Sequence, residues 1–166
     1  MRRSRAPTRR PHATSSQILT RLRRLGYPQN VIGMARFGIN PSGTLGISVV
    51  HLRKLTRELG TDHALARKLW ASRLHEARIL ASFIDDPRLV TPAQMDRWIP
   101  AFDSWDVCDQ VCGLFEQTRW VRTKITAWAG DNREFVKRAA FAMIAGLAVH
   151  DKALHNRDIE AFFSIE

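Results

Sequence analysis

Acidic residues are absent from the first third of this chain. No aspartate or glutamate occurs among residues 1–57, which hold 12 of the 26 lysines and arginines, and Glu58 is the first carboxylate. The remaining residues carry 14 basic and 16 acidic side chains, so the formal net charge of +10 originates in the N-terminal part. A positive excess confined in this way favours a negatively charged polymer as partner.

Three further absences narrow the class of protein. No run of 18 or more apolar residues occurs, which excludes a membrane-spanning helix. The N-terminal arginines are not followed by an apolar stretch, so this segment is not a secretory signal. The only two cysteines, Cys108 and Cys112, lie four residues apart in a helical pattern, where we expect buried thiols rather than a disulfide. A reducing, cytoplasmic setting follows as the expectation.

Residues 1–13 contain five arginines among proline, serine and threonine, which predicts a disordered basic arm ahead of one helical domain over residues 14–166. Such an arm adds salt-dependent affinity for phosphate polymers without reading their sequence. A merely solubilising start is the alternative, and the sequence does not choose between the two.

Apolar residues recur at helical spacing through almost all of the rest, and no segment has a convincing strand pattern. We expect a glycine-broken connection at residues 33–46. The expected helices cover residues 18–25, 48–59, 61–71, 75–84, 92–102, 103–115, 119–129, 131–149 and 156–163. Short helices with short links favour stacked antiparallel pairs, and a period of about 30–45 residues per pair is typical of HEAT and armadillo arrays. The predicted class is therefore an all-α, HEAT-like superhelix, with a compact helical bundle as the alternative.

The segment from Trp105 to Asp109 carries the strongest chemical signal. With a step of about 100° per residue, Trp105 and Asp109 fall about 40° apart on their helix and away from its apolar stripe. An aromatic face and a carboxylate thus share one exposed edge. On spacing alone, a tryptophan flanking a core beside a solvated aspartate is an equally ordinary explanation.

Metal chemistry has little support in the sequence. Asp103, Asp106 and Asp109 fan over about 120° of the helix, so we expect solvated carboxylates near a helix start rather than a magnesium site. His75-Glu76 lacks the second histidine of a zinc-binding helix. We expect no metal and no cofactor.

The other tryptophans and the late basic residues have two interpretations each. Trp70, Trp98, Trp120 and Trp128 suit packing between helices, although Trp70 could also face DNA. The basic residues either form a phosphate-facing strip or a solvated helix face. They are Arg119, Arg122, Lys124, Lys137 and Arg138.

Several stretches, in order and at sensible spacing, resemble the DNA alkylation repair family of HEAT-repeat DNA glycosylases. The stretches are residues 34–39, 69–70, 75–81, 102–106 and 135–139. The resemblance implies that Asp109 and Trp105 are the catalytic carboxylate and aromatic residue, and that Arg138 lies near the DNA backbone. Lys137 beside it is a further DNA-binding candidate. Arg36 either contacts DNA or braces the first repeat.

This resemblance implies a repair glycosylase that releases cationic 3-methyl or 7-methyl purines from double-stranded DNA, in the cytoplasm at the nucleoid. A non-catalytic protein that recognises DNA shape and a protein-interaction scaffold are the alternatives. The family continues with further helices that carry another DNA-facing aromatic, whereas this sequence ends at Glu166. We therefore expect a shortened concave surface, which puts catalysis in question.

Overall fold

The computed structural model describes residues 13–151 and residue 160. This part contains nine α-helices and a short 3-10 helix, and no strand, in agreement with the predicted class. The α-helices are α1 (Ser15–Leu25), α2 (Pro28–Arg36), α3 (Val49–Leu59), α4 (His63–Ala71), α5 (His75–Ile84), α6 (Pro92–Trp98), α7 (Trp105–Phe115), α8 (Val121–Ala129) and α9 (Glu134–His150). The 3-10 helix, Ile99–Ala101, follows α6. The predicted arm, apart from Ala13, and the predicted helix at 156–163, apart from Glu160, lie outside the described residues.

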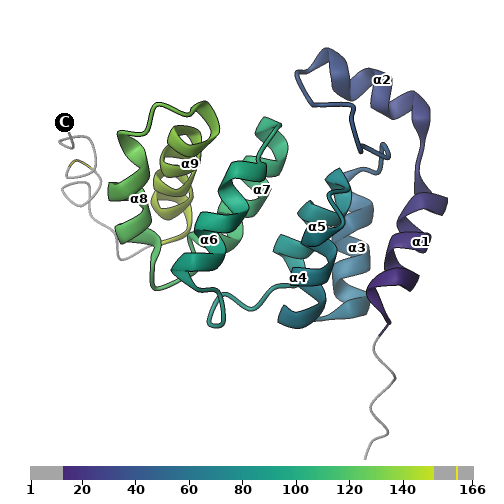
Figure 1. The fold of residues 1–166 in the computed structure, drawn as a ribbon, viewed down its shortest axis with the longest axis horizontal. Helices are drawn as coiled ribbons and strands as arrows, with labels where there is room; N and C mark the ends of the chain where they lie inside the picture. The colour runs from purple at the N-terminus through teal and green to yellow at the C-terminus, as the bar shows by residue number, and fades with distance from the viewer. Residues whose placement is uncertain (1–12, 152–159, 161–166) are drawn as a thin grey trace, which may run out of the picture.

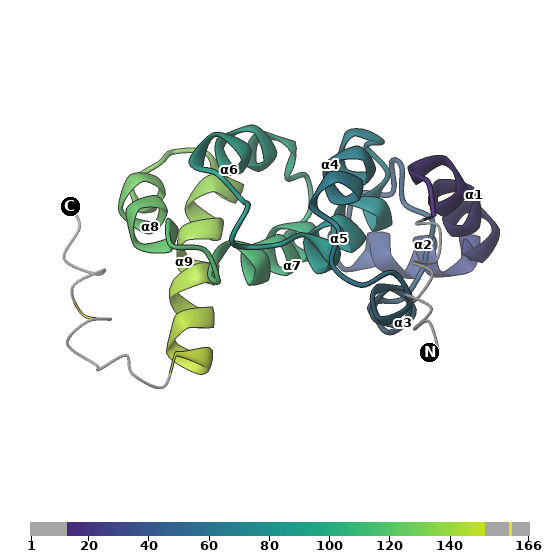
Figure 2. The ribbon, with the colours of Figure 1, turned by 90° about the horizontal axis from the view of Figure 1, so that it is seen from below.

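The helices form two layers (Figures 1 and 2). Helices α3, α5, α7 and α9 pack in succession on one another, α4 packs on α5, and α8 packs on α9. Figure 2 shows α4, α6 and α8 along one side of the array and α3, α5, α7 and α9 along the other. This stacking of an inner and an outer series is the HEAT-like architecture that the sequence predicted.

An aromatic row joins the repeats from inside. The Trp70 and Trp98 rings stack with their centroids 4.0 Å apart, and Phe102, Phe115 and Trp128 continue the row toward α8. Trp70 is only 8% exposed, so the possible DNA-facing role for this residue is wrong. Large rings that are buried in this way contribute strongly to the core by removing apolar surface from water.

Most helix boundaries follow from the residues at the ends. The Asp62 side chain accepts a hydrogen bond from Leu65 N, and the Thr91 hydroxyl accepts one from Gln94 N, so these residues cap α4 and α6. Gly60 ends α3 with φ +70°, a conformation that suits glycine. The helix predicted over residues 92–102 is shorter in the structure and ends at Trp98. Pro100 interrupts the α-helical hydrogen bonding, and the chain forms a 3-10 turn before Phe102.

Helix α2 corrects the prediction of a glycine-broken connection from residue 33. The helix continues through Gly33 to Arg36, and only the segment after it is irregular. None of its residues is buried, so it has no apolar stripe facing the core that the sequence pattern could reveal. Pro28 at the first helical position was the available signal.

A buried carboxylate fixes the segment between α2 and α3. Glu76, which is 0% exposed, accepts hydrogen bonds from the backbone N–H groups of Leu45, Gly46 and Ile47 at 2.7–3.1 Å. The Asn40 N–H donates to Ser104 Oγ at 2.8 Å, which attaches the same segment to the start of α7. In the sequence, Glu76 stands out only as part of an incomplete zinc motif, whereas in the structure its carboxylate organises this loop.

Candidate functional site

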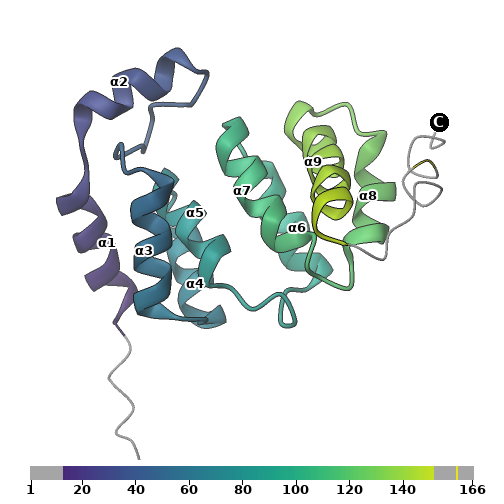
Figure 3. The ribbon, with the colours of Figure 1, turned by 180° about the vertical axis from the view of Figure 1, so that it is seen from behind.

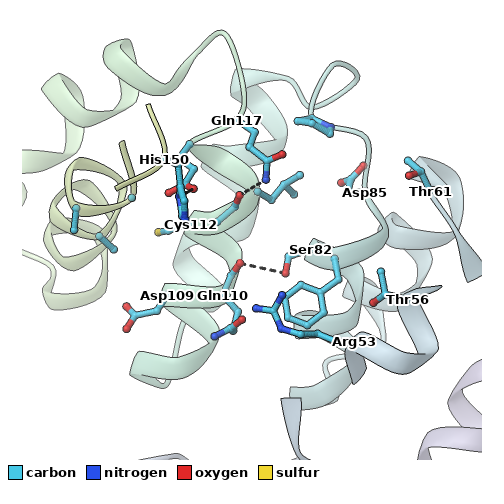
Figure 4. A pocket seen from close by; sticks show the side chains of 18 of the residues that line it. Arg53, Thr56, Thr61, Ser82, Asp85, Asp109, Gln110, Cys112, Gln117 and His150 are labelled. Atoms are coloured by element: carbon cyan, nitrogen blue, oxygen red, sulfur yellow. Dashed lines mark hydrogen bonds and ion pairs between the residues drawn. The ribbon is translucent and has the colours of Figure 1, made fainter. Parts of the chain in front are cut away.

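The layer that consists of α3, α5, α7 and α9 forms a groove of about 1360 Å³ (Figure 4). Its walls come from α3 and α5 on one side and from α7 and α9 on the other. The polar and charged side chains that line it include Arg53, Thr56, Arg57, Thr61, Ser82, Asp85, Asp109, Gln110, Glu116, Gln117, Arg138 and His150. A groove along the inner helices of an array is the usual place for an extended ligand.

The structure places Trp105 and Asp109 on one edge of α7, one helical turn apart and away from the core. Trp105 is 40% exposed and Asp109 has 35% of its side chain accessible, so both side chains reach solvent. Asp109 lines the groove, whereas Trp105, the first residue of the helix, is not part of the groove lining. The Trp105 ring is oriented by its Nε1–H, which donates to the Phe37 carbonyl at 2.8 Å.

Arg138 holds Asp109 from the neighbouring helix. Its Nε and Nη2 donate to the two oxygens of the Asp109 carboxylate at 2.9 and 2.8 Å, a bidentate ion pair between α9 and α7. This hydrogen bonding is the main reason that the pKa of Arg138 lies above its ordinary value. The pair leaves 43% of the Arg138 side chain accessible, so the guanidinium also faces solvent beside the carboxylate. The structure thus brings together two residues that the sequence analysis had singled out separately.

The opposite wall carries cations that the sequence analysis missed. Arg53 and Arg57 of α3 line the groove, and the Arg53 guanidinium lies 4.8 Å from the centroid of the Phe83 ring. Within the described part of the chain, neither arginine forms an ion pair with a carboxylate. Their spacing of four residues, which places both on one helix face, was the signal that could have found them. Both walls of the groove therefore offer guanidinium groups (Figure 4 shows Arg53 across from Asp109).

Asp106 corrects an expectation. The residue is 8% exposed, and its carboxylate accepts a 2.8 Å hydrogen bond from His75 Nε2 and another from its neighbour's backbone, Val107 N–H. It is therefore a structural residue and not a solvated carboxylate at the helix start. Asp103 and Asp109 point to other partners, and the described residues contain no cluster of three potential metal ligands.

The late basic residues divide between two layers. Lys124 is 8% exposed and pairs with Asp96, with its ammonium 5.3 Å from the Trp128 ring, so its place in a phosphate-facing strip is wrong. Arg119 and Arg122 are exposed, but they lie beside and on α8 and do not line the groove. Only Arg138 of the five contributes to the groove lining.

The remaining candidates have clear positions. Lys137 is exposed on α9 beside Arg138, and Arg36 is exposed at the end of α2, outside the groove lining. Cys108 and Cys112 are buried as predicted, and their thiols donate to backbone carbonyls of α9. The pKa of the Cys112 thiol is raised, first by its hydrogen bond with Cys108 and then by burial, which makes an unreactive thiol.

The fold and the groove define a HEAT-like helical-repeat protein, and the comparisons identify its family. The model of the DNA alkylation repair enzyme family matches residues 18–165, and the chain belongs to this family. A solved structure of a protein family described as related to the HEAT-like repeat DNA glycosylases, with affinity for branched DNA structures, is similar to the chain with a TM-score of 0.79 and 18% identity. The match covers 90% of this chain and 64% of the other, so the chain spans about two thirds of that protein. A search of curated proteins finds no significant match. No helix in the described part is long and apolar enough to cross a membrane.

Proposed function

We propose that the groove binds double-stranded DNA by its phosphates and that the chain is an N-glycosylase for cationic alkylated purines. The observation that carries the proposal is the position of Asp109, a partly exposed carboxylate that lines the groove beside Trp105 and Arg138. Guanidinium groups on both walls, from Arg53, Arg57 and Arg138, suit the phosphates of a backbone. The cytoplasm, at the nucleoid, is the corresponding place of action.

The proposed reaction breaks the bond between C1′ of the deoxyribose and the ring nitrogen of the base. A purine methylated at N3 or N7 is cationic, so it takes the bonding electron pair and leaves as a neutral base without an added proton. The sugar becomes an oxocarbenium cation, which the Asp109 carboxylate would stabilise. Water then adds to C1′ and gives up a proton. Trp105 would present its ring face to the cationic nucleotide.

The ion pair with Arg138 gives the site a defined order of events. While Arg138 holds both oxygens of Asp109, the carboxylate charge is largely compensated. A DNA phosphate that binds Arg138 would compete for the guanidinium and leave Asp109 more negative beside the sugar. In this proposal, backbone binding therefore precedes and promotes the reaction.

Asp109→Asn tests the proposal, because it keeps the size of the side chain and removes the charge. Release of 7-methylguanine or 3-methyladenine from methylated duplex DNA, measured by chromatography, should fall by about 2–4 kcal/mol of transition-state stabilisation. Affinity for undamaged DNA should rise, because Arg138 loses its internal partner. The matched control is Asp131→Asn, which removes a bidentate pair of the same geometry, with Arg133, outside the groove. This control should leave base release unchanged.

A non-catalytic DNA-binding protein that recognises DNA shape is the second candidate. The bidentate engagement of Asp109 favours it, because a carboxylate that stays compensated gives little stabilisation to a sugar cation. Salt-dependent DNA binding without any base release by the wild-type chain would select this candidate. Absence of DNA binding in moderate salt would instead favour a protein-interaction scaffold.

A further inference from the structure

Phe37 exposes more of its surface than any other large apolar residue in the described part of the chain. It is 76% exposed, although an aromatic ring normally contributes its stability by burial. Phe37 directly follows Arg36, which is exposed and is the last residue of α2. None of the functions proposed above uses Phe37.

The backbone around Phe37 is fixed although the side chain is not buried. The N–H groups of Phe37 and Ile39 both donate to the Met34 carbonyl, at 3.0 and 3.3 Å, and Gly38 N–H donates to the Ala35 carbonyl at 3.1 Å. Gly38 turns the chain with φ +76°, and Ile39 is buried directly after it, with 8% exposed. These hydrogen bonds at the C-terminal end of α2 fix the main chain on both sides of Phe37, while the Phe37 ring stays exposed to solvent.

Phe37 also contacts the edge of α7 that carries Trp105 and Asp109. Its carbonyl accepts the hydrogen bond from Trp105 Nε1, so Phe37 and Trp105 are neighbours although they are far apart in sequence. Figure 3 shows the turn after α2 approaching the first turn of α7. Phe37 and Trp105, both exposed aromatic residues, are therefore neighbours through this hydrogen bond, and the exposed Arg36 precedes Phe37 in the chain. Trp105 in turn lies one turn of helix from Asp109, which lines the groove.

We infer that Phe37 is a specificity-determining residue that stacks on an unpaired base at an interruption of the DNA duplex. Every base has a flat aromatic face, but a fully paired duplex covers these faces by stacking. An exposed ring on a fixed backbone therefore gains affinity only where a base has lost its neighbour, and the adjacent arginine suits the phosphate of that nucleotide. The inference rests on the proposed DNA binding in the groove, and it adds the substrate class: duplex DNA with a bulge, gap or junction.

The test compares a duplex that contains a short bulge of unpaired adenines with a fully paired duplex of equal phosphate number, by fluorescence anisotropy. We expect the wild-type chain to bind the bulged DNA roughly tenfold more tightly, which corresponds to about 1.4 kcal/mol of stacking. Phe37→Ala should bind both DNAs equally and with the affinity of the wild type for paired DNA. Phe37→Trp should restore the preference. 2-Aminopurine in the bulge should lose emission on binding to the wild type and not to Phe37→Ala.

Leu89→Ala is the control, because Leu89 is 54% exposed and lies in the turn after α5, outside the groove lining. It should keep the wild-type preference. Equal binding of both DNAs by the wild type, or a preference that survives in Phe37→Ala, overturns the role of Phe37 and leaves DNA binding intact. Failure of the wild type to bind any DNA would instead refute the proposed function itself. If Phe37→Ala lowers the mass measured by sedimentation, the ring belongs to a contact between two copies, and the inference is wrong.

Discussion

Glu76 determines the shape of a whole loop through one side chain. Its carboxylate satisfies the N–H groups of Leu45, Gly46 and Ile47 where no solvent reaches. The sequence could not reveal this, because a glutamate at the start of a helix usually interacts with that helix's own free N–H groups. The partners of Glu76 are about 30 residues earlier in the chain, as Arg138 is far along the chain from Asp109. Sequence periodicity placed Trp105 and Asp109 on one edge, but only the packing of α7 on α9 shows what Asp109 contacts.

Glu76→Gln should destabilise the protein strongly. The glutamine amide nitrogen would face backbone donors, so buried N–H groups would lose their acceptor. We expect the free energy of unfolding to fall by about 2–4 kcal/mol, measured by urea denaturation. Glu58→Gln, which removes an exposed pair with Arg21, should change stability little. A similar small effect of both substitutions would contradict the role given to Glu76.

Asp85 should make stability depend on pH in the opposite sense to most carboxylates. Burial raises the pKa of its side chain, in spite of hydrogen bonds with His63 and Gln94. A carboxyl group that binds its proton more tightly in the folded state stabilises the fold at low pH and loses this contribution as the pH rises through the raised pKa. Asp85→Asn should therefore gain stability relative to the wild type as the pH rises above about 4, the ordinary pKa of an aspartate, in a measurement kept below the ordinary pKa of histidine. Urea denaturation across this range measures the difference, and parallel curves would refute the prediction.

At the scale of the elements, helix caps decided how well the boundaries could be predicted. Helix α5 has the predicted limits, His75–Ile84, because Asp85-Asp86-Pro87 stops it clearly. Helix α2 was missed because it buries nothing, and a stripe pattern reports burial rather than helix formation. The hydrogen bond between Trp105 and Phe37, the residue that follows α2, was therefore missing from the predicted structure as well.

The packing of α7 on α9 can be tested with two glycines. A methyl group on Gly146 of α9 would overlap the Glu116 carboxylate, which pairs with His150 at 2.7 Å, whereas Gly113 of α7 has open space around it. Gly113→Ala should raise the free energy of unfolding by about 0.5–1 kcal/mol. Gly146→Ala should gain less, because Glu116 must move and loses His150.

Urea denaturation gives the two stabilities. Equal gains at Gly113 and Gly146 would show that Glu116 does not occupy the position described.

At the scale of the whole molecule, the charge asymmetry should govern affinity for DNA. The N-terminal third supplies the excess of positive charge, and its α3 contributes Arg53 and Arg57 to the groove. We expect the logarithm of the association constant to fall linearly with the logarithm of salt concentration, with little preference for sequence. Arg53→Gln and Arg57→Gln should each reduce the slope by about 0.9 if the arginine contacts one phosphate.

Arg97→Gln, on the exposed side of α6, is the control and should leave the slope unchanged. Deletion of residues 1–11 should also weaken binding and flatten the slope if the basic arm takes part. Binding that does not respond to salt would contradict the phosphate-based mechanism for both the groove and the arm.

The stack of Trp70 on Trp98 has a consequence for how the molecule can be studied. The two indoles belong to α4 and α6, in consecutive repeats, and lie face to face at 4.0 Å with an interplanar angle of 3°. Their emission and their near-ultraviolet circular dichroism therefore depend on the separation of the repeats. Any bending of the array when a ligand enters the groove changes these signals. The curvature of the wild-type chain can thus be followed by spectroscopy without an added dye.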